Sequence, residues 1–141
     1  MTYNDNITIE KIWIDNEFFQ VSVFCETNII SVSTNIYMNS ESIDELHHQI
    51  KHFLDNGEEN VYWQCVVKGS DSTPSISVLF SALDKLGHIQ IEVYLELDDN
   101  STDVVHSCCF FVLTEYGRLF DFNEKLEKLK EGSPGVYISL R

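Results

Sequence analysis

The sequence predicts an α+β fold, a mainly antiparallel sheet or sandwich of about seven to eight strands with two helices. Apolar and polar residues alternate along most of the chain, which is the pattern of strands with one buried face. Two segments, residues 42–56 and 121–131, instead place apolar residues at helical spacing. With 141 residues and no linker or internal repeat, we expect residues 1–141 to form a single domain.

The clearest strand runs from His88 to Asp98. Five apolar residues fall on one of its sides: Ile89, Ile91, Val93, Leu95 and Leu97. Shorter alternating segments at residues 19–25, 30–36 and 76–80 indicate further strands of the same kind. Val136, Ile138 and Leu140 indicate a short strand at the end of the chain.

Two other segments, Val61–Val67 and Val104–Leu113, are apolar on both sides of the alternation. We therefore expect central strands that are covered on both faces. Between residues 12–14 and 18–19, Asp15-Asn16 suits a tight hairpin turn. The apolar phase changes across Glu10-Lys11, and a β-bulge would explain that change.

Both predicted helices have recognisable ends. The first begins with a capping box, in which Ser42 and Glu45 would each bond a backbone amide of the other, and Asn56-Gly57 ends it. The second repeats this capping logic at Asp121–Glu124 and ends at Gly132. The predicted order is three strands, a helix, four strands, a helix and a final strand.

The charge of the chain excludes several functions. There are 23 acidic and 9 basic residues, a net charge of -14, so there is no basic face to neutralise nucleic-acid phosphates. Residues 1–117 carry 19 of the acids and 4 of the bases, and residues 118–141 are almost neutral. Because there is no secretory signal pattern and no apolar run of about 20 residues, we expect a cytoplasmic protein without a membrane partner.

The four cysteines are Cys25, Cys65, Cys108 and Cys109, without any Cys-x-x-Cys spacing. Neighbours on a strand point to opposite faces, so Cys108 and Cys109 cannot easily share one metal site. We expect all four to be reduced, buried and structural.

The histidines do not form a recognisable catalytic or metal motif. His48 and His52 have the i,i+4 spacing of metal ligands, but two of the four ligands of a typical site are missing. His88 or His106 could act as a general base, yet the sequence has neither a nucleophile elbow nor a phosphate-binding loop. The prediction is a protein that is not an enzyme, with no catalytic residue, metal site or cofactor.

The outward side of the His88–Asp98 strand is the candidate binding site. Five polar residues alternate along it: Gln90, Glu92, Tyr94, Glu96 and Asp98. Three carboxylates around an aromatic side chain can attract and hold a cationic protein. The alternative interpretation is the solvated face of a sheet kept soluble by charge, and a helix could also cover that face.

Several features together resemble a known family. A strand ending at Ile36-Tyr37-Met38 leads to the 42–56 helix, and Leu86-Gly87-His88-Ile89-Gln90-Ile91 follows. Then come a His106–Leu113 strand, a turn at Thr114-Glu115-Tyr116 and a Leu- and Phe-rich helix at 119–129. Over roughly residues 17–130 this resembles small acidic bacterial proteins related to the wall-associated-protein immunity proteins of contact-dependent toxin systems.

The resemblance implies a protein that binds and neutralises a cognate toxin domain without catalysis. A basic toxin would be attracted to the acidic body of this chain. Two alternatives stay open, another non-enzymatic interaction module and a domain that binds a small ligand between sheet and helix. The ligand binder should have an apolar pocket with a few convergent polar groups.

Overall fold

The computed structural model describes residues 3–57, 59–65, 76–97 and 106–141 of the chain. The described elements follow one another as β1 (Asn6–Ile14), β2 (Phe19–Glu26), β3 (Ser31–Met38), α1 (Ser40–Asn56), β4 (Val61–Cys65), β5 (Ile76–Ala82), β6 (His88–Leu97), β7 (His106–Glu115), α2 (Tyr116–Glu131) and β8 (Tyr137–Ser139). This confirms the predicted α+β class and the predicted order of strands and helices.

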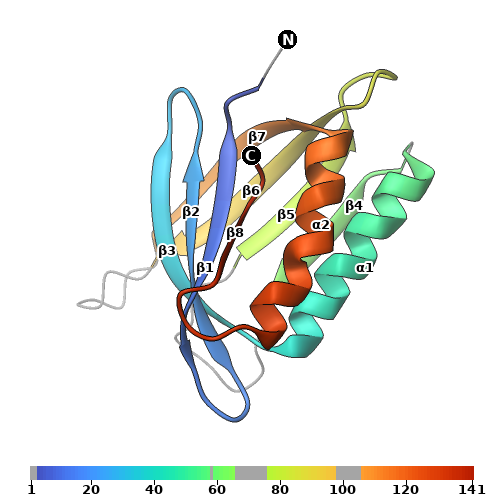
Figure 1. The fold of residues 1–141 in the computed structure, drawn as a ribbon. Helices are drawn as coiled ribbons and strands as arrows, with labels where there is room; N and C mark the ends of the chain where they lie inside the picture. The colour runs from blue at the N-terminus through green and yellow to red at the C-terminus, as the bar shows by residue number, and fades with distance from the viewer. Residues whose placement is uncertain (1–2, 58, 66–75, 98–105) are drawn as a thin grey trace.

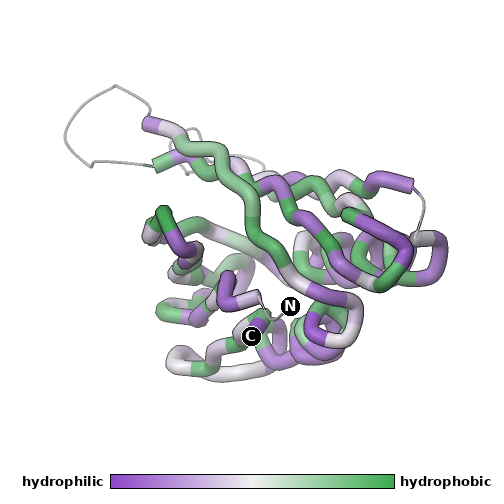
Figure 2. The backbone as a smooth tube through the Cα atoms, turned by 90° about the horizontal axis from the view of Figure 1, so that it is seen from above, coloured by the Kyte–Doolittle hydropathy of each residue, from purple (hydrophilic) through white to green (hydrophobic). Residues whose placement is uncertain are grey.

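The eight strands form two antiparallel sheets of four strands each. The first has the order β3-β2-β1-β8 and the second has the order β4-β5-β6-β7. Helices α1 and α2 lie side by side (Figure 1), with α1 next to β4 of the second sheet and α2 next to β7 and to β8 of the first sheet. Along the strands, apolar and polar residues alternate as the sequence predicts (Figure 2).

One hydrophobic core draws on both sheets and both helices. Its most buried members include Val23 and Ile36 from the first sheet, Val93 from the second and Ile50 and Leu129 from the helices. Most inward residues of the described alternating strands belong to this core, and Ile30, Val32 and Leu97 pack against it while partly exposed, which agrees with the predicted phase. Both helices therefore pack against the inner face of the second sheet and leave its opposite face open.

The prediction of two doubly covered central strands is wrong. Both β4 and β7 are edge strands of the second sheet, and each buries only one face. The side chain of Tyr62 is 52% exposed and that of Phe111 is 50% exposed. In β4 and β7, apolar residues on both faces therefore mean that one apolar face of the strand is exposed to solvent. Val66, Val67, Val104 and Val105 lie outside the described residues.

The first hairpin confirms the predicted turn and moves the bulge by one residue. The register of β1 against β2 shifts between Lys11 and Trp13, so Ile12 is the extra residue. Asp15 organises the turn, because its carboxylate accepts from the amides of Glu17 and Phe18, both at 2.8 Å. After the bulge, residues 12–14 are exposed, whereas the inward position before it is occupied by a fully buried lysine, Lys11.

The helix starts differ from the prediction. The N-cap of α1 is Asn39, whose side chain accepts from the Ser42 amide at 2.9 Å while Ser42 Oγ accepts from the Asn39 amide at 3.1 Å. The capping box therefore begins three residues before the predicted one, and Glu45 takes no part in it. Helix α2 begins at Tyr116 directly after β7, so 114–116 is not a turn and Asp121 lies inside the helix. Both helix ends, before Gly57 and Gly132, are as predicted.

Candidate functional site

The predicted binding residues lie on the open face of the second sheet. Gln90, Glu92, Tyr94 and Glu96 alternate along β6 and are all partly exposed; we call them the β6 strip. Asp98, the fifth predicted residue, lies outside the described residues. Both described helices pack on the inner face, where the ring centres of Phe53 of α1 and Phe80 of β5 are 5.8 Å apart, so neither of them covers the strip.

The neighbours of the strip make this face both apolar and acidic. Glu92 lies between Leu79 of β5 and Phe111 of β7, and Tyr94 lies between Ser77 and Cys109. None of the four described strands of this sheet contains a lysine or arginine. The strip therefore has carboxylates beside an exposed aromatic ring and no lysine or arginine in the described strands of its own sheet.

Among the described residues, two side-chain contacts involve the carboxylates of the β6 strip. The Tyr94 hydroxyl donates to Glu96 Oε1 at 3.3 Å, and the Cys109 thiol donates to Glu92 Oε1 at 3.5 Å. Partial burial, followed by the contact with Glu92, raises the pKa of the Cys109 thiol. Both carboxylates keep further oxygen lone pairs that a cationic partner can use.

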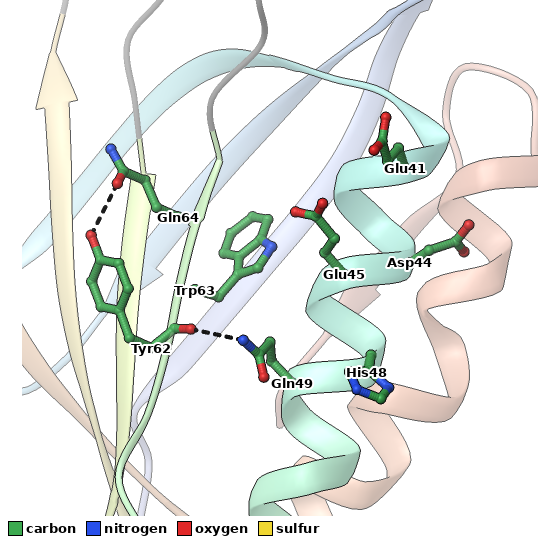
Figure 3. Close-up of a pocket in the computed structure, with 8 residues that line it drawn as sticks. All are labelled: Glu41, Asp44, Glu45, His48, Gln49, Tyr62, Trp63 and Gln64. Carbon is green, nitrogen blue, oxygen red and sulfur yellow. Dashed lines mark hydrogen bonds between the residues drawn. The ribbon is translucent and has the colours of Figure 1, made fainter.

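A second acidic site lies at the other edge of the sheet, between α1 and β4. Figure 3 shows this cleft, which has a volume of about 440 Å³. We call it the acidic cleft, and its lining residues are Glu41, Asp44, Glu45, His48, Gln49, Tyr62, Trp63 and Gln64. The sequence pattern does not connect these acids of α1 with Trp63, because the segment that contains Trp63 was expected to be a central strand.

The carboxylates of the acidic cleft are unequally neutralised. Asp44 Oδ1 accepts from Lys130 Nζ at 2.7 Å. This contact is the main reason that the pKa of Lys130 is raised. Glu41 and Glu45 have no ion-pair or hydrogen-bond partner among the described residues. Gln49 Nε2 donates to the Tyr62 carbonyl at 3.3 Å and so links α1 to the β4 edge.

Trp63 forms the inner wall of the cleft. Its side chain is 4% exposed, and its indole Nε1 is buried without a hydrogen-bond partner among the described residues. In Figure 3 the indole nitrogen is on the side of the ring that faces α1 and Glu45. A buried N–H group without an acceptor is uncommon in native structures and unfavourable.

A third feature is a pocket of about 510 Å³ where α1, the β5–β6 turn and the start of α2 meet. Phe53 and Ile89 contribute apolar surface, and Lys85 and His88 are among its polar residues. His88 Nδ1 lies 2.5 Å from Asp84 Oδ2, and this contact is the main reason that the pKa of Asp84 is lowered. The predicted base candidate thus lies in a pocket beside a carboxylate, although Asp84 also bonds backbone amides of its own turn.

The remaining histidines do not gather into a site. His48 lines the acidic cleft, and His52 Nε2 lies 3.6 Å from Glu59 Oε2. His47 Nδ1 is 3.2 Å from the Asn123 carbonyl and connects the two helices. His106 begins β7, and within the described ranges there is no group of three or more residues that could hold a metal ion.

The cysteines are all free thiols, but they are not all buried. Burial raises the pKa of Cys25 to about 12 and that of Cys65 to about 11, which makes both unreactive at neutral pH. Cys108 is partly buried and Cys109 is exposed, on opposite faces of β7 as predicted. The expectation of a buried Cys109 is therefore wrong.

Comparisons with known proteins found no relative. No protein-family model matches the sequence, and no curated protein or solved structure is significantly similar to it. Of the helices in the described parts of the chain, neither has the length and apolar character needed to cross a membrane.

Proposed function

We propose that the chain is a non-enzymatic binding protein of the immunity type, which holds a basic toxin domain on the open face of its second sheet. The observation that carries the proposal is the composition of this face, with the carboxylates of Glu92 and Glu96, the exposed ring of Phe111 and no lysine or arginine in the described strands of the sheet. Aromatic anchors supply most of the energy of such interfaces, and carboxylates speed the encounter with a cationic partner.

The cytoplasmic location expected from the sequence belongs to the same proposal, because an immunity protein must meet the toxin where the toxin acts. The -14 net charge provides the long-range attraction. Attraction of this kind raises association rates steeply at low salt and is screened at high salt.

The test is co-expression with the toxin domain encoded next to this chain, with cell survival and complex formation as readouts. Glu92→Lys with Glu96→Lys should abolish protection, because two attractive contacts become repulsive. The matched control is Glu124→Lys with Glu131→Lys, which changes the charge equally at exposed positions of α2. Equal loss of protection in both double variants, or no protection by the unaltered chain, would contradict the proposal.

Cys109 provides an independent measurement. Its exposed thiol lies 3.5 Å from Glu92, so a partner on this face should protect it from alkylation. The buried Cys25 and Cys65 should not react in the folded protein, with or without the partner. Unchanged labelling of Cys109 in the complex would move the interface away from β6.

A second candidate function, small-ligand binding, is favoured by the 510 Å³ pocket at the β5–β6 turn. Its apolar residues and its polar residues Lys85 and His88 suit a ligand with an apolar body and a polar or anionic group. The fluorescent anion 8-anilinonaphthalene-1-sulfonate tests this reading. Native protein should bind it, and Lys85→Glu should bind it several-fold more weakly; equal binding by both would argue against the pocket.

A further inference from the structure

The acidic cleft has the chemistry of a receptor for a guanidinium group. We propose that it holds an arginine side chain of the partner protein, with the guanidinium between Glu41 and Glu45. The inference rests on the proposed function for the source of the arginine, and on the cleft alone for the chemistry. It adds a second contact site to the β6 strip, on the other side of the β4 edge.

The first argument is the pair of unpartnered carboxylates. Glu41 and Glu45 are four residues apart on α1, so their side chains lie one turn apart on the same face, and like charges at this spacing repel. Lys130 neutralises Asp44 at 2.7 Å, but no described cation reaches the other two acids. A cation between Glu41 and Glu45 removes their repulsion.

The second argument is the unpaired N–H group of Trp63. The indole Nε1 is buried, has no acceptor among the described residues and faces Glu45 (Figure 3). A carboxylate has two oxygens and can accept several hydrogen bonds. With a cation bound, Glu45 can accept from the indole with one oxygen and from the ligand with the other. The cation and the buried N–H would then share one carboxylate.

The third argument distinguishes arginine from other cations. A planar guanidinium has five N–H donors and can bond two carboxylates at once, whereas an ammonium acts as a compact point charge. In Figure 3 the Tyr62 ring points away from α1 toward Gln64, so the selectivity rests on the two carboxylates alone. Two carboxylates one helical turn apart fit the several donors of a guanidinium better than a single ammonium.

The position of the cleft explains why a protein partner would use it. The open face of the second sheet is four strands wide and about as long as β5, which has seven residues. At ordinary strand dimensions its projected area is about 400 Å², roughly half of the ~800 Å² that each partner buries in a standard interface. A partner must extend beyond the sheet, and Tyr62 and Gln64 of the edge strand β4 connect the open face with the cleft.

The test is a titration of the whole protein with Nα-acetyl-arginine amide, followed by heteronuclear NMR of the two tryptophan indole N–H groups. The Trp63 signal should shift with increasing probe, and the Trp13 signal, from an exposed ring on the first sheet, should not. Nα-acetyl-citrulline amide, which has the same shape without the charge, should shift neither signal.

Variants make the assignment specific. Glu41→Gln and Glu45→Gln should each weaken binding of the arginine probe about fivefold, and the double variant should lose the shift of Trp63. Glu124→Gln with Glu131→Gln is the control for net charge and should bind as the native protein does. The proposal is overturned if citrulline shifts Trp63 as arginine does, or if the double cleft variant responds like the native chain.

Free L-arginine distinguishes the source of the ligand. It carries an additional ammonium and carboxylate, and binding about tenfold tighter than the capped form would identify a free amino acid as the ligand and overturn the peptide assignment. The titration contains no partner protein, so its failure leaves the survival assay of the β6 strip unaffected. Conversely, loss of the strip interaction leaves the arginine titration standing.

Discussion

Lys11 offers a sharp test of how this fold is held together. Its side chain is fully buried, and no carboxylate of the described residues pairs with it. The ammonium donates to the Leu129 carbonyl at 2.8 Å and to the Lys130 carbonyl at 3.3 Å, and it lies 4.4 Å above the centre of the Phe19 ring. It thus binds carbonyls in the last turn of α2, where the helix dipole favours a positive charge.

The expected effect of Lys11→Met follows from these contacts. Methionine keeps the packing against Phe19 and removes the desolvation penalty of the ammonium. It also removes the donor to the Leu129 and Lys130 carbonyls, and a buried acceptor without a partner costs about 1–3 kcal/mol. We expect the second effect to be larger, with a net loss of about 2 kcal/mol of unfolding free energy.

The assay is urea unfolding at neutral pH, followed by tryptophan fluorescence. Lys125→Met, at an exposed position of α2, is the control and should stay within about 0.5 kcal/mol of the native protein. If Lys11→Met is as stable as the native chain or more stable, then the buried ammonium is a net burden and the reasoning above is wrong.

The pH dependence of the stability difference between the native protein and Lys11→Met gives a second measurement. Desolvation lowers the pKa of Lys11 below the ordinary lysine value, so the unfolded chain binds the proton more tightly than the folded chain. At lower pH Lys11 is protonated in the folded state, and the desolvation of its charge lowers the unfolding free energy. As the pH rises through the folded pKa, Lys11 loses its proton and this penalty disappears. Native protein should therefore gain stability relative to Lys11→Met in the alkaline range.

Three further predictions concern single contacts. Asn39→Ala should cost about 1 kcal/mol of unfolding free energy by removing the N-cap of α1, while Glu45→Ala should change it by less than about 0.5 kcal/mol in urea unfolding. Glu92→Gln should speed alkylation of Cys109 near pH 8, because the nearby carboxylate helps to raise the pKa of that thiol; an unchanged rate would show that burial alone sets it. The pKa of Asp84 is lowered in the fold, so Asp84→Asn should lower the unfolding free energy at pH 7. The difference between the two proteins should vanish as the pH falls through the lowered pKa. A difference that does not change with pH would show that the charge of Asp84 does not stabilise the fold.

The fold was largely predictable because burial follows alternation. Every second residue of β6, such as Val93 and Leu95, is apolar and lies in the core. Each strand of a sheet that packs on a core needs one such apolar side. The errors arose where the pattern is ambiguous. An apolar residue on the outer face of an edge strand, such as Phe111, looks in sequence like one buried between two layers. The alternation of apolar and polar residues does not indicate which strand lies at the edge of a sheet.

The candidate site was only partly predictable for the same reason. The β6 strip is local in sequence, so its shared face could be inferred from i,i+2 spacing. The acidic cleft joins α1 to a strand that follows it, and nothing in the spacing of Glu41 and Glu45 indicates that Trp63 faces them. Lys11 carries no signal of its burial either, because lysine is almost always exposed and its partners are carbonyls at the far end of the chain.

The burial of Lys11 makes the surface more negative than the composition suggests, and this can be tested with salt. The Lys11 ammonium donates to the backbone carbonyls of Leu129 and Lys130, so its charge does not neutralise a carboxylate at the described surface. Added salt should therefore slow association with a basic partner, because the exposed acids are screened. The unfolding free energy should hold or rise, because screening relieves the mutual repulsion of those acids; a fall in stability with salt would mean that surface ion pairs hold the fold together.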